Sequence, residues 1–179
     1  MAKIVLITGG ARSGKSDYAQ KRAEELSGKH FFIATCPAVD LEMADRIKRH
    51  QQSRANGQWQ TIEEETALSL VINELPNDSV CLLDCLTLWV NNLMYRAEKS
   101  CEEIDEDTIC TYVEDLLAAA DKYQGTLICV SNEVGMGVVP DNLMARKYRD
   151  YVGRCNRLIA EAADEVIFVS CGLPLFLKK

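Results

Sequence analysis

The sequence has no apolar run that approaches the roughly 18 residues of a membrane span, so we expect no transmembrane helix. Its first residues lack the charged region, apolar stretch and cleavage site of a signal peptide, and we expect none. Basic residues are outnumbered, with 20 Lys and Arg against 27 Asp and Glu, which gives a net charge of −7. Because a nucleic-acid-binding domain carries a basic face, we expect no nucleic-acid partner.

Metal-binding patterns are also missing. The sequence has eight cysteines but no Cys-x-x-Cys pair, and its two histidines are His30 and His50. A zinc site is therefore not expected. Cysteines such as Cys81 and Cys129 lie inside apolar runs, where a thiol acts as a small hydrophobic side chain. Unpaired thiols are typical of the reducing cytoplasm, where we expect this protein to reside.

Apolar segments of two kinds alternate along the chain. Short β-branched runs predict buried strands, and apolar residues at helical spacing predict helices. We expect strands at 3–8, 30–35, 59–63, 79–84, 126–130 and 165–169, and helices at 16–27, 40–56, 67–74, 86–94, 109–120 and 142–163. The acidic stretch 98–108 and the segment 131–140 are expected to be irregular. This alternation predicts a single α/β domain over 1–179, with a mostly parallel sheet flanked by helices.

A phosphate-binding loop (P-loop) is the strongest motif, because the pattern G-x-x-x-x-G-K-[ST] is complete and lies between a predicted strand and a predicted helix. Its residues are Gly9, Gly10, Ala11, Arg12, Ser13, Gly14, Lys15 and Ser16. Glycines let backbone N–H groups point at phosphate oxygens, and the helix N-terminus adds its positive dipole. We expect Lys15 at the β- and γ-phosphates of a nucleoside triphosphate and Ser16 on Mg²⁺. The alternative is a glycine-rich turn that binds nothing.

A P-loop needs a carboxylate to organise its magnesium, and Asp84 ends an apolar run of the expected kind. The alternative role for Asp84 is a helix N-cap, and the two roles can coexist. The chain has neither the Asn-Lys-x-Asp motif of Ras-type GTPases nor the Gly-rich loop of protein kinases. These motifs indicate a fold of the P-loop NTPase type (RecA-like) and a kinase of a small molecule.

His50 lies in the basic segment Ala44–Arg54. On a helix, residues four apart are neighbours, so Arg46, His50 and Arg54 share one face. Nearby cations keep an imidazole neutral and free to act as a nucleophile, and they stabilise charge on a phosphate under attack. The residues alone leave open the simpler alternative, in which His50 is a solvated side chain on a charged helix.

Further motifs follow one another in order along nearly the whole chain. They are Ile7–Ser16, Ile33–Thr35, Glu42–Ile47 leading into His50, Asp84–Thr87 with Asn91–Leu93, Ser131–Pro140, and Tyr148–Asp150. On these motifs the chain resembles the bifunctional adenosylcobinamide kinase / adenosylcobinamide-phosphate guanylyltransferase family of cobalamin assembly. The combination of Gly-Gly-Ala-Arg-Ser-Gly-Lys-Ser with Asn-Glu-Val-Gly-Met-Gly is very specific.

The resemblance implies two reactions. The first phosphorylates the hydroxyl on the aminopropanol arm of adenosylcobinamide with ATP or GTP. The second transfers GMP from GTP to adenosylcobinamide phosphate, giving adenosylcobinamide-GDP and pyrophosphate. The resemblance also implies that a histidine, here His50, becomes guanylylated, which splits one displacement into two. A homotrimer is implied by the resemblance alone.

The resemblance also implies nucleotide contacts beyond the P-loop. They are Ala34, Thr35 and Cys36, then Gln51, Gln52, Ser53 and Arg54, and finally Glu63 and Asp84. Taken alone, the first group is compatible with a plain strand end and the second with a solvated helix face. Two other functions stay open at this point: a P-loop small-molecule kinase without the guanylyltransferase step, and a nucleotide-binding regulatory module without chemistry.

Overall fold

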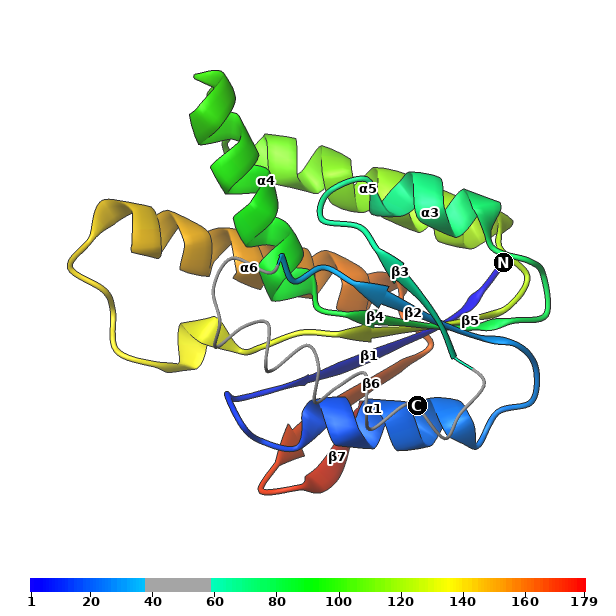
Figure 1. Cartoon of the computed structure of the whole chain (residues 1–179). Helices are drawn as coiled ribbons and strands as arrows, with labels where there is room; N and C mark the ends of the chain where they lie inside the picture. The colour runs from blue at the N-terminus through cyan, green and yellow to red at the C-terminus, as the bar shows by residue number, and fades with distance from the viewer. Residues whose placement is uncertain (38–58) are drawn as a thin grey trace.

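A seven-stranded sheet forms the centre of the protein, within the part of the chain that the structure describes (Figure 1). The computed structural model describes residues 1–37 and 59–179. The strand order is β3-β2-β4-β5-β1-β6-β7, and every neighbouring pair is parallel except β6 and β7. The strands are β1 (Lys3–Gly9), β2 (His30–Ala34), β3 (Trp59–Glu63), β4 (Val80–Asp84), β5 (Thr126–Val130), β6 (Glu165–Ser170) and β7 (Leu173–Lys178).

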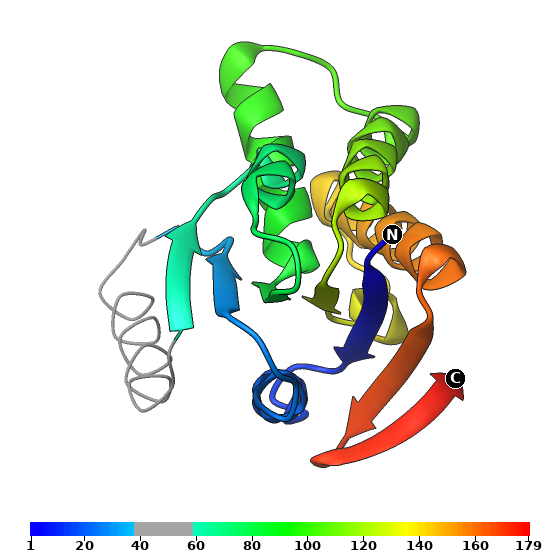
Figure 2. The same ribbon diagram turned by 90° about the vertical axis from the view of Figure 1, so that its right-hand side faces the viewer.

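Helices cover both faces of the sheet. Figures 1 and 2 show α1 on one face, whereas α3, α4, α5 and α6 form a layer on the other. Their bounds are α1 (Lys15–Glu24), α3 (Leu68–Glu74), α4 (Leu86–Ser100), α5 (Glu106–Lys122) and α6 (Leu143–Ala162). A short 3₁₀ turn, η1 (Val134–Met136), lies between β5 and α6.

Strand β1 shows why a strand of this sheet consists almost entirely of apolar residues. Side chains alternate between the two faces of a strand. Ile4 and Leu6 therefore pack with the α3–α6 layer, whereas Val5 and Ile7 pack with α1. Because both faces are covered, each position after Lys3 must be apolar or small, and β1 is buried at every residue from Ile4 to Gly9.

The mostly parallel sheet flanked by helices is confirmed. The strands predicted at 59–63 and 126–130 have those bounds, and each of the other predicted strands in the described residues differs by one residue at one end. Helices predicted at 67–74, 109–120 and 142–163 also lie where expected. The helix predicted at 40–56 lies outside the described residues.

The sequence pattern missed β7 and overstated two loops. All side chains of β7 are exposed and Pro174 lies within it, so neither alternation nor burial marks it as a strand. Its edge position explains both features, because an edge strand leaves one row of backbone groups unpaired. The expected irregular stretch 98–108 shrinks to 101–105, because α4 continues to Ser100 and Asp105 caps α5. The loop 131–140 contains η1. Among the described residues, no helix is long and apolar enough to cross a membrane.

Candidate active site at the carboxyl edge of the sheet

Two glycines allow the P-loop to pass from β1 to α1. Gly9 has φ +157°, and a Cβ there would lie 2.3 Å from the carbonyl oxygen of Val169 on the neighbouring strand β6. Gly14 has φ +89° just before α1 begins at Lys15. A side chain at Gly9 would collide with backbone, and one at Gly14 would strain the left-handed conformation. The geometry of the loop therefore requires both glycines of the motif.

Polar groups of the P-loop are held by contacts within the loop and by a contact from the β6–β7 turn. The Lys15 side chain is buried, and its Nζ donates to the carbonyl of Gly10 at 3.3 Å. The N–H of Gly172, in the β6–β7 turn, donates to the carbonyl of Ser13 at 2.8 Å. Within the described residues, the Ser13 hydroxyl is the one buried side-chain polar atom without a hydrogen-bond partner. Because leaving such a group unpaired is costly, a ligand oxygen in the loop would satisfy it.

Three predicted site residues lie at one level of the sheet edge beside the loop. In the register of the sheet, Ala34 of β2 pairs with Glu63 of β3 on one side and with Asp84 of β4 on the other. Asp84 also pairs with Val130 of β5, which is the strand between β4 and β1. The carboxyl ends of these parallel strands thus bring Glu63, Ala34 and Asp84 to the edge where the P-loop lies. His50 and Gln51–Arg54 lie outside the described residues.

Asp84 is not the N-cap of α4, so that alternative is wrong. The N-cap position is Cys85, and no side chain caps the helix there. The backbone of Cys85 is instead held by Thr35, whose hydroxyl accepts from the Cys85 N–H at 2.7 Å and donates to its carbonyl at 2.9 Å. Burial, reinforced by the Asp84 carboxylate, raises the pKa of the Cys85 thiol to about 11. This thiol is therefore protonated near neutral pH and is no candidate nucleophile.

Oxygen ligands for magnesium are available at this edge. Ser16 follows Lys15 in the first turn of α1, and Asp84 ends β4. The described residues contain no group of three or more His, Cys, Asp or Glu that could hold a metal without help. Magnesium fits such a donor set, because it is commonly held by one or two protein oxygens together with substrate phosphates.

A second carboxylate, Glu133, lies beside the P-loop, and the sequence assigned it no role apart from that of its loop. Its Oε1 accepts from the hydroxyl of Thr8, at 2.5 Å, and from Nδ2 of Asn156, at 3.2 Å. In the sequence, only its position in the motif Asn-Glu-Val-Gly-Met-Gly marked it, and a loop motif does not reveal a partner at the end of β1.

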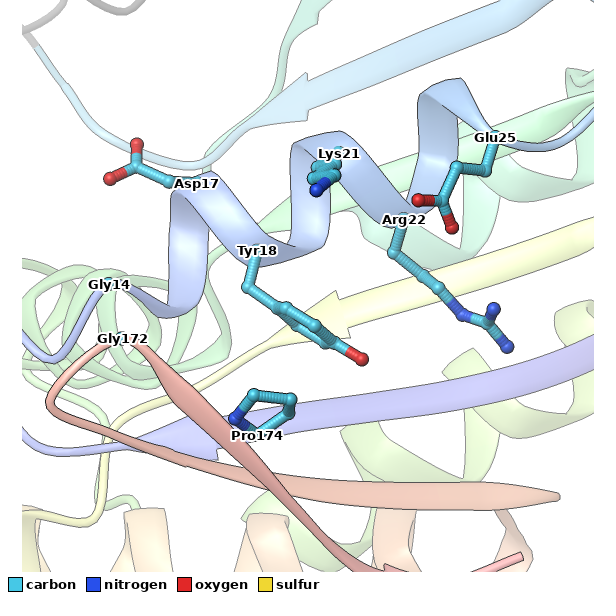
Figure 3. A pocket seen from close by; sticks show the side chains of 8 residues that line it. All are labelled: Gly14, Asp17, Tyr18, Lys21, Arg22, Glu25, Gly172 and Pro174. Carbon is cyan, nitrogen blue, oxygen red and sulfur yellow. The ribbon is translucent and has the colours of Figure 1, made fainter.

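A groove of about 490 Å³ opens along α1 on the other side of the P-loop (Figure 3). The ring of Tyr18 and the ring of Pro174 lie on opposite walls of it, on α1 and β7. The remaining lining residues are Gly14, Asp17, Lys21, Arg22, Glu25 and Gly172. Of the described residues predicted to bind nucleotide, only Gly14 lines this groove. Ala34, Glu63 and Asp84 lie instead at the ends of β2, β3 and β4.

A parallel α/β sheet, a complete P-loop between its β1 and α1, and a carboxylate at the end of a nearby strand define the class of P-loop nucleotide-binding enzymes. Comparison with known families then narrows the class. Residues 5–177 match the family described as cobinamide kinase / cobinamide phosphate guanyltransferase, and the chain belongs to this family. It is therefore an enzyme of cobalamin biosynthesis, both a kinase and a nucleotidyltransferase.

Relatives agree with this assignment along nearly their whole length. The chain is 38% identical to the bifunctional adenosylcobalamin biosynthesis protein CobU of Escherichia coli, over 98% of this chain and 99% of that protein. It is 41% identical to the bifunctional adenosylcobalamin biosynthesis protein CobP of Pseudomonas aeruginosa, over 97% and 96%.

A solved structure of an ATPase from a bacterial type III secretion system shares the fold, with a TM-score of 0.57. The match covers 97% of this chain but 56% of the ATPase, and the sequences are 13% identical. At that identity the likeness shows the P-loop fold and nothing about substrate.

Proposed function

We propose that this enzyme phosphorylates adenosylcobinamide with ATP or GTP and then transfers GMP from GTP, through a guanylylated His50, to adenosylcobinamide phosphate. The observation that supports this proposal most directly is the arrangement of the sheet edge. The P-loop, Asp84, Ala34 and Glu63 all lie there, and the chain leaves β2 at that edge to enter the segment that carries His50.

The phosphate-handling groups have distinct roles in this proposal. Lys15 and the N–H groups of the loop bind the β- and γ-phosphates, and Ser13 donates its otherwise unpaired hydroxyl to a phosphate oxygen. Ser16 and Asp84 hold Mg²⁺, which would neutralise charge that develops on the leaving phosphate oxygens.

His50 acts only in the second reaction. Its neutral imidazole attacks the α-phosphorus of GTP, a P–N bond forms, and the P–O bond to pyrophosphate breaks. A phosphate oxygen of adenosylcobinamide phosphate then attacks the same phosphorus, and the P–N bond breaks to release His50. Gln51–Arg54, Ala34–Cys36 and Glu63 contact the nucleotide in this proposal.

The cellular setting is also a proposal. We infer a homotrimer in the cytoplasm, from the resemblance to the family and from cysteines that are all unpaired in the described residues. Sedimentation at micromolar concentration checks the first part, and a species of one chain would contradict it.

Labelling with GTP that is radioactive at the α-phosphate tests the covalent step. We expect wild-type protein to carry acid-labile, alkali-stable GMP, and His50→Ala to lose the label while it still phosphorylates cobinamide. The matched control is His30→Gln, because His30 is the other histidine of the chain. His30 begins β2, at the end of the strand opposite Ala34, and its Nε2 contacts the carbonyl of Ala23 on α1. We expect this control to keep the label.

Three other outcomes would change the assignment. An unlabelled wild-type protein that phosphorylates cobinamide would favour a kinase without the transferase step. A protein that binds GTP but turns over no cobinamide would favour a regulatory module. Retention of the label in His50→Ala would show that another residue is the nucleophile.

A further inference from the structure

Glu133 is attached to the P-loop through its backbone. The pairing of β5 with β1 continues past the end of β5, because the N–H of Ser131 donates to Ile7 at 3.0 Å and the N–H of Glu133 donates to Gly9 at 3.1 Å. Gly9 is the first residue of the P-loop. Since β5 lies between β1 and β4, Glu133 stands at the sheet edge between the P-loop and Asp84.

The Glu133 side chain is oriented through one of its two oxygens. Its Oε1 accepts from Thr8 and from Asn156. Asn156 is itself buried on α6 and fixed, because its Nδ2 also donates to the carbonyl of Asn132 at 3.0 Å and its Oδ1 accepts from the Ser131 hydroxyl at 2.5 Å. Among residues 1–37 and 59–179, Oε2 has no hydrogen-bond or ion-pair partner, and the Glu133 residue is half-buried.

The two reactions differ in what the attacking group needs. In the kinase step the nucleophile is a hydroxyl, which must lose its proton as it attacks. In the transferase step the nucleophile is a phosphate, which is already ionised at neutral pH. A carboxylate base beside the phosphate loop is therefore useful to the first reaction and dispensable for the second.

We propose that Glu133 is the general base of the kinase step. The proposal rests on the proposed function above. As the substrate hydroxyl attacks the γ-phosphorus, its O–H bond breaks and the proton passes to Oε2 of Glu133. The new O–P bond forms while the bond from the γ-phosphorus to the bridging oxygen breaks, and the nucleoside diphosphate leaves. Thr8 and Asn156 are positioning residues, since they hold Oε1 so that Oε2 stays available.

Glu133→Gln is the decisive variant because it replaces the base without removing the acceptor. The amide oxygen can still accept from Thr8 and Asn156, while an amide nitrogen takes the place of Oε2. We expect kcat for cobinamide phosphorylation to fall about 100-fold or more, with KM for cobinamide changed less than about threefold. Guanylylation of the enzyme and GMP transfer to adenosylcobinamide phosphate supplied ready-made should stay at the wild-type rate.

Two further variants test whether the effect of Glu133→Gln comes from the loss of this carboxylate and not from a general effect of the substitution. Glu114→Gln removes an exposed carboxylate on α5 and should leave both reactions unchanged. Glu133→Asp keeps a carboxylate but withdraws it by one methylene, and its kinase activity should lie between those of wild type and Glu133→Gln. This second substitution keeps the test decisive if the glutamine variant folds poorly.

Equal losses in both reactions would overturn the proposal, because they would indicate a structural or magnesium-linked role. Unchanged kinase activity in Glu133→Gln, with a normal wild type, would overturn it while leaving the proposed function intact. A wild-type protein that phosphorylates no cobinamide would overturn the proposed function and this inference together.

Discussion

Thr35 binds the backbone of Cys85 from both directions and is fully buried. Asn92 adds a third contact, because its Nδ2 donates to the carbonyl of Thr35 at 2.8 Å. These bonds hold the start of α4 at the edge of the sheet, directly after Asp84. The Thr35 side chain therefore supports the site from beneath, and the nucleotide contact predicted for this residue stays a prediction.

We predict that Thr35→Val destabilises the fold by roughly 1–3 kcal/mol, because the buried N–H of Cys85 loses its partner while the side-chain volume stays similar. The carbonyl of Cys85 loses the Thr35 hydroxyl but keeps the N–H of Trp89. Urea unfolding at pH 7 measures the loss. Thr111→Val is the matched control, since Thr111 is exposed on α5 and donates only to the Asp107 carbonyl. A loss of less than about 0.5 kcal/mol in Thr35→Val would contradict the role given to this hydroxyl.

At the scale of elements, Glu165 joins the strand and the helix that flank the P-loop. This residue begins β6, and its carboxylate contacts Lys3 of β1 at 2.6 Å and Arg22 of α1 at 3.1 Å. The hydrogen bond from Lys3, with the charges of Lys3 and Arg22, lowers the pKa of Glu165 below its ordinary value of 4.5. The ion pair thus holds β1, β6 and α1 together below the loop.

The lowered pKa sets the sign of a pH dependence. A carboxyl with a lower pKa in the folded state stabilises the fold above its unfolded pKa and loses that contribution as pH falls. We predict that Glu165→Gln costs about 1 kcal/mol at pH 7, discounted because Lys3 is half-exposed. The difference from wild type should shrink as pH falls below about 4.5, as measured by chemical unfolding across pH. Glu161→Gln breaks an exposed helical pair with Arg157 and should cost a few tenths of a kcal/mol. A difference that grows on acidification would refute the assignment.

For the whole molecule, ligand binding and folding are linked. The P-loop exists only when β1, β6 and α1 are assembled, so a triphosphate should bind the folded chain and not the unfolded chain. We predict that Mg²⁺-GTP at 100 times its Kd adds about 2.7 kcal/mol to the free energy of unfolding. Lys15→Ala should abolish most of that gain, and EDTA should reduce it if Ser16 and Asp84 hold the metal.

Thermal unfolding with and without nucleotide measures this effect. Lys99→Ala provides the control, because Lys99 is exposed on α4 and lies over the ring of Tyr95, away from the sheet edge. An equal nucleotide-dependent shift in wild type and Lys15→Ala would mean that the triphosphate binds elsewhere, for which the groove beside Tyr18 is the first place to look.

The sequence predicted the fold well wherever burial produces a recognisable pattern of apolar residues. Strand β5 is buried on both faces, so its apolar residues form a continuous run. Helix α6 is buried along one stripe, so its apolar residues fall at helical spacing. Strand β7 produces no such pattern, because all of its side chains are exposed and its one ladder partner is β6. Its identity as a strand depends on a pairing across the β6–β7 turn, which local pattern cannot reveal.

For this protein, the sequence by itself determined the phosphate loop, the parallel sheet and the family, because each depends on residue types at short, fixed spacing. Only the tertiary structure decided which distant residues meet at the loop. Ala34, Glu63 and Asp84 come to one level through strand register, and Thr8, Glu133 and Asn156 join through contacts between β1, the end of β5 and α6. Such contacts are set by strand order and packing, and neither is encoded in the spacing of a single segment.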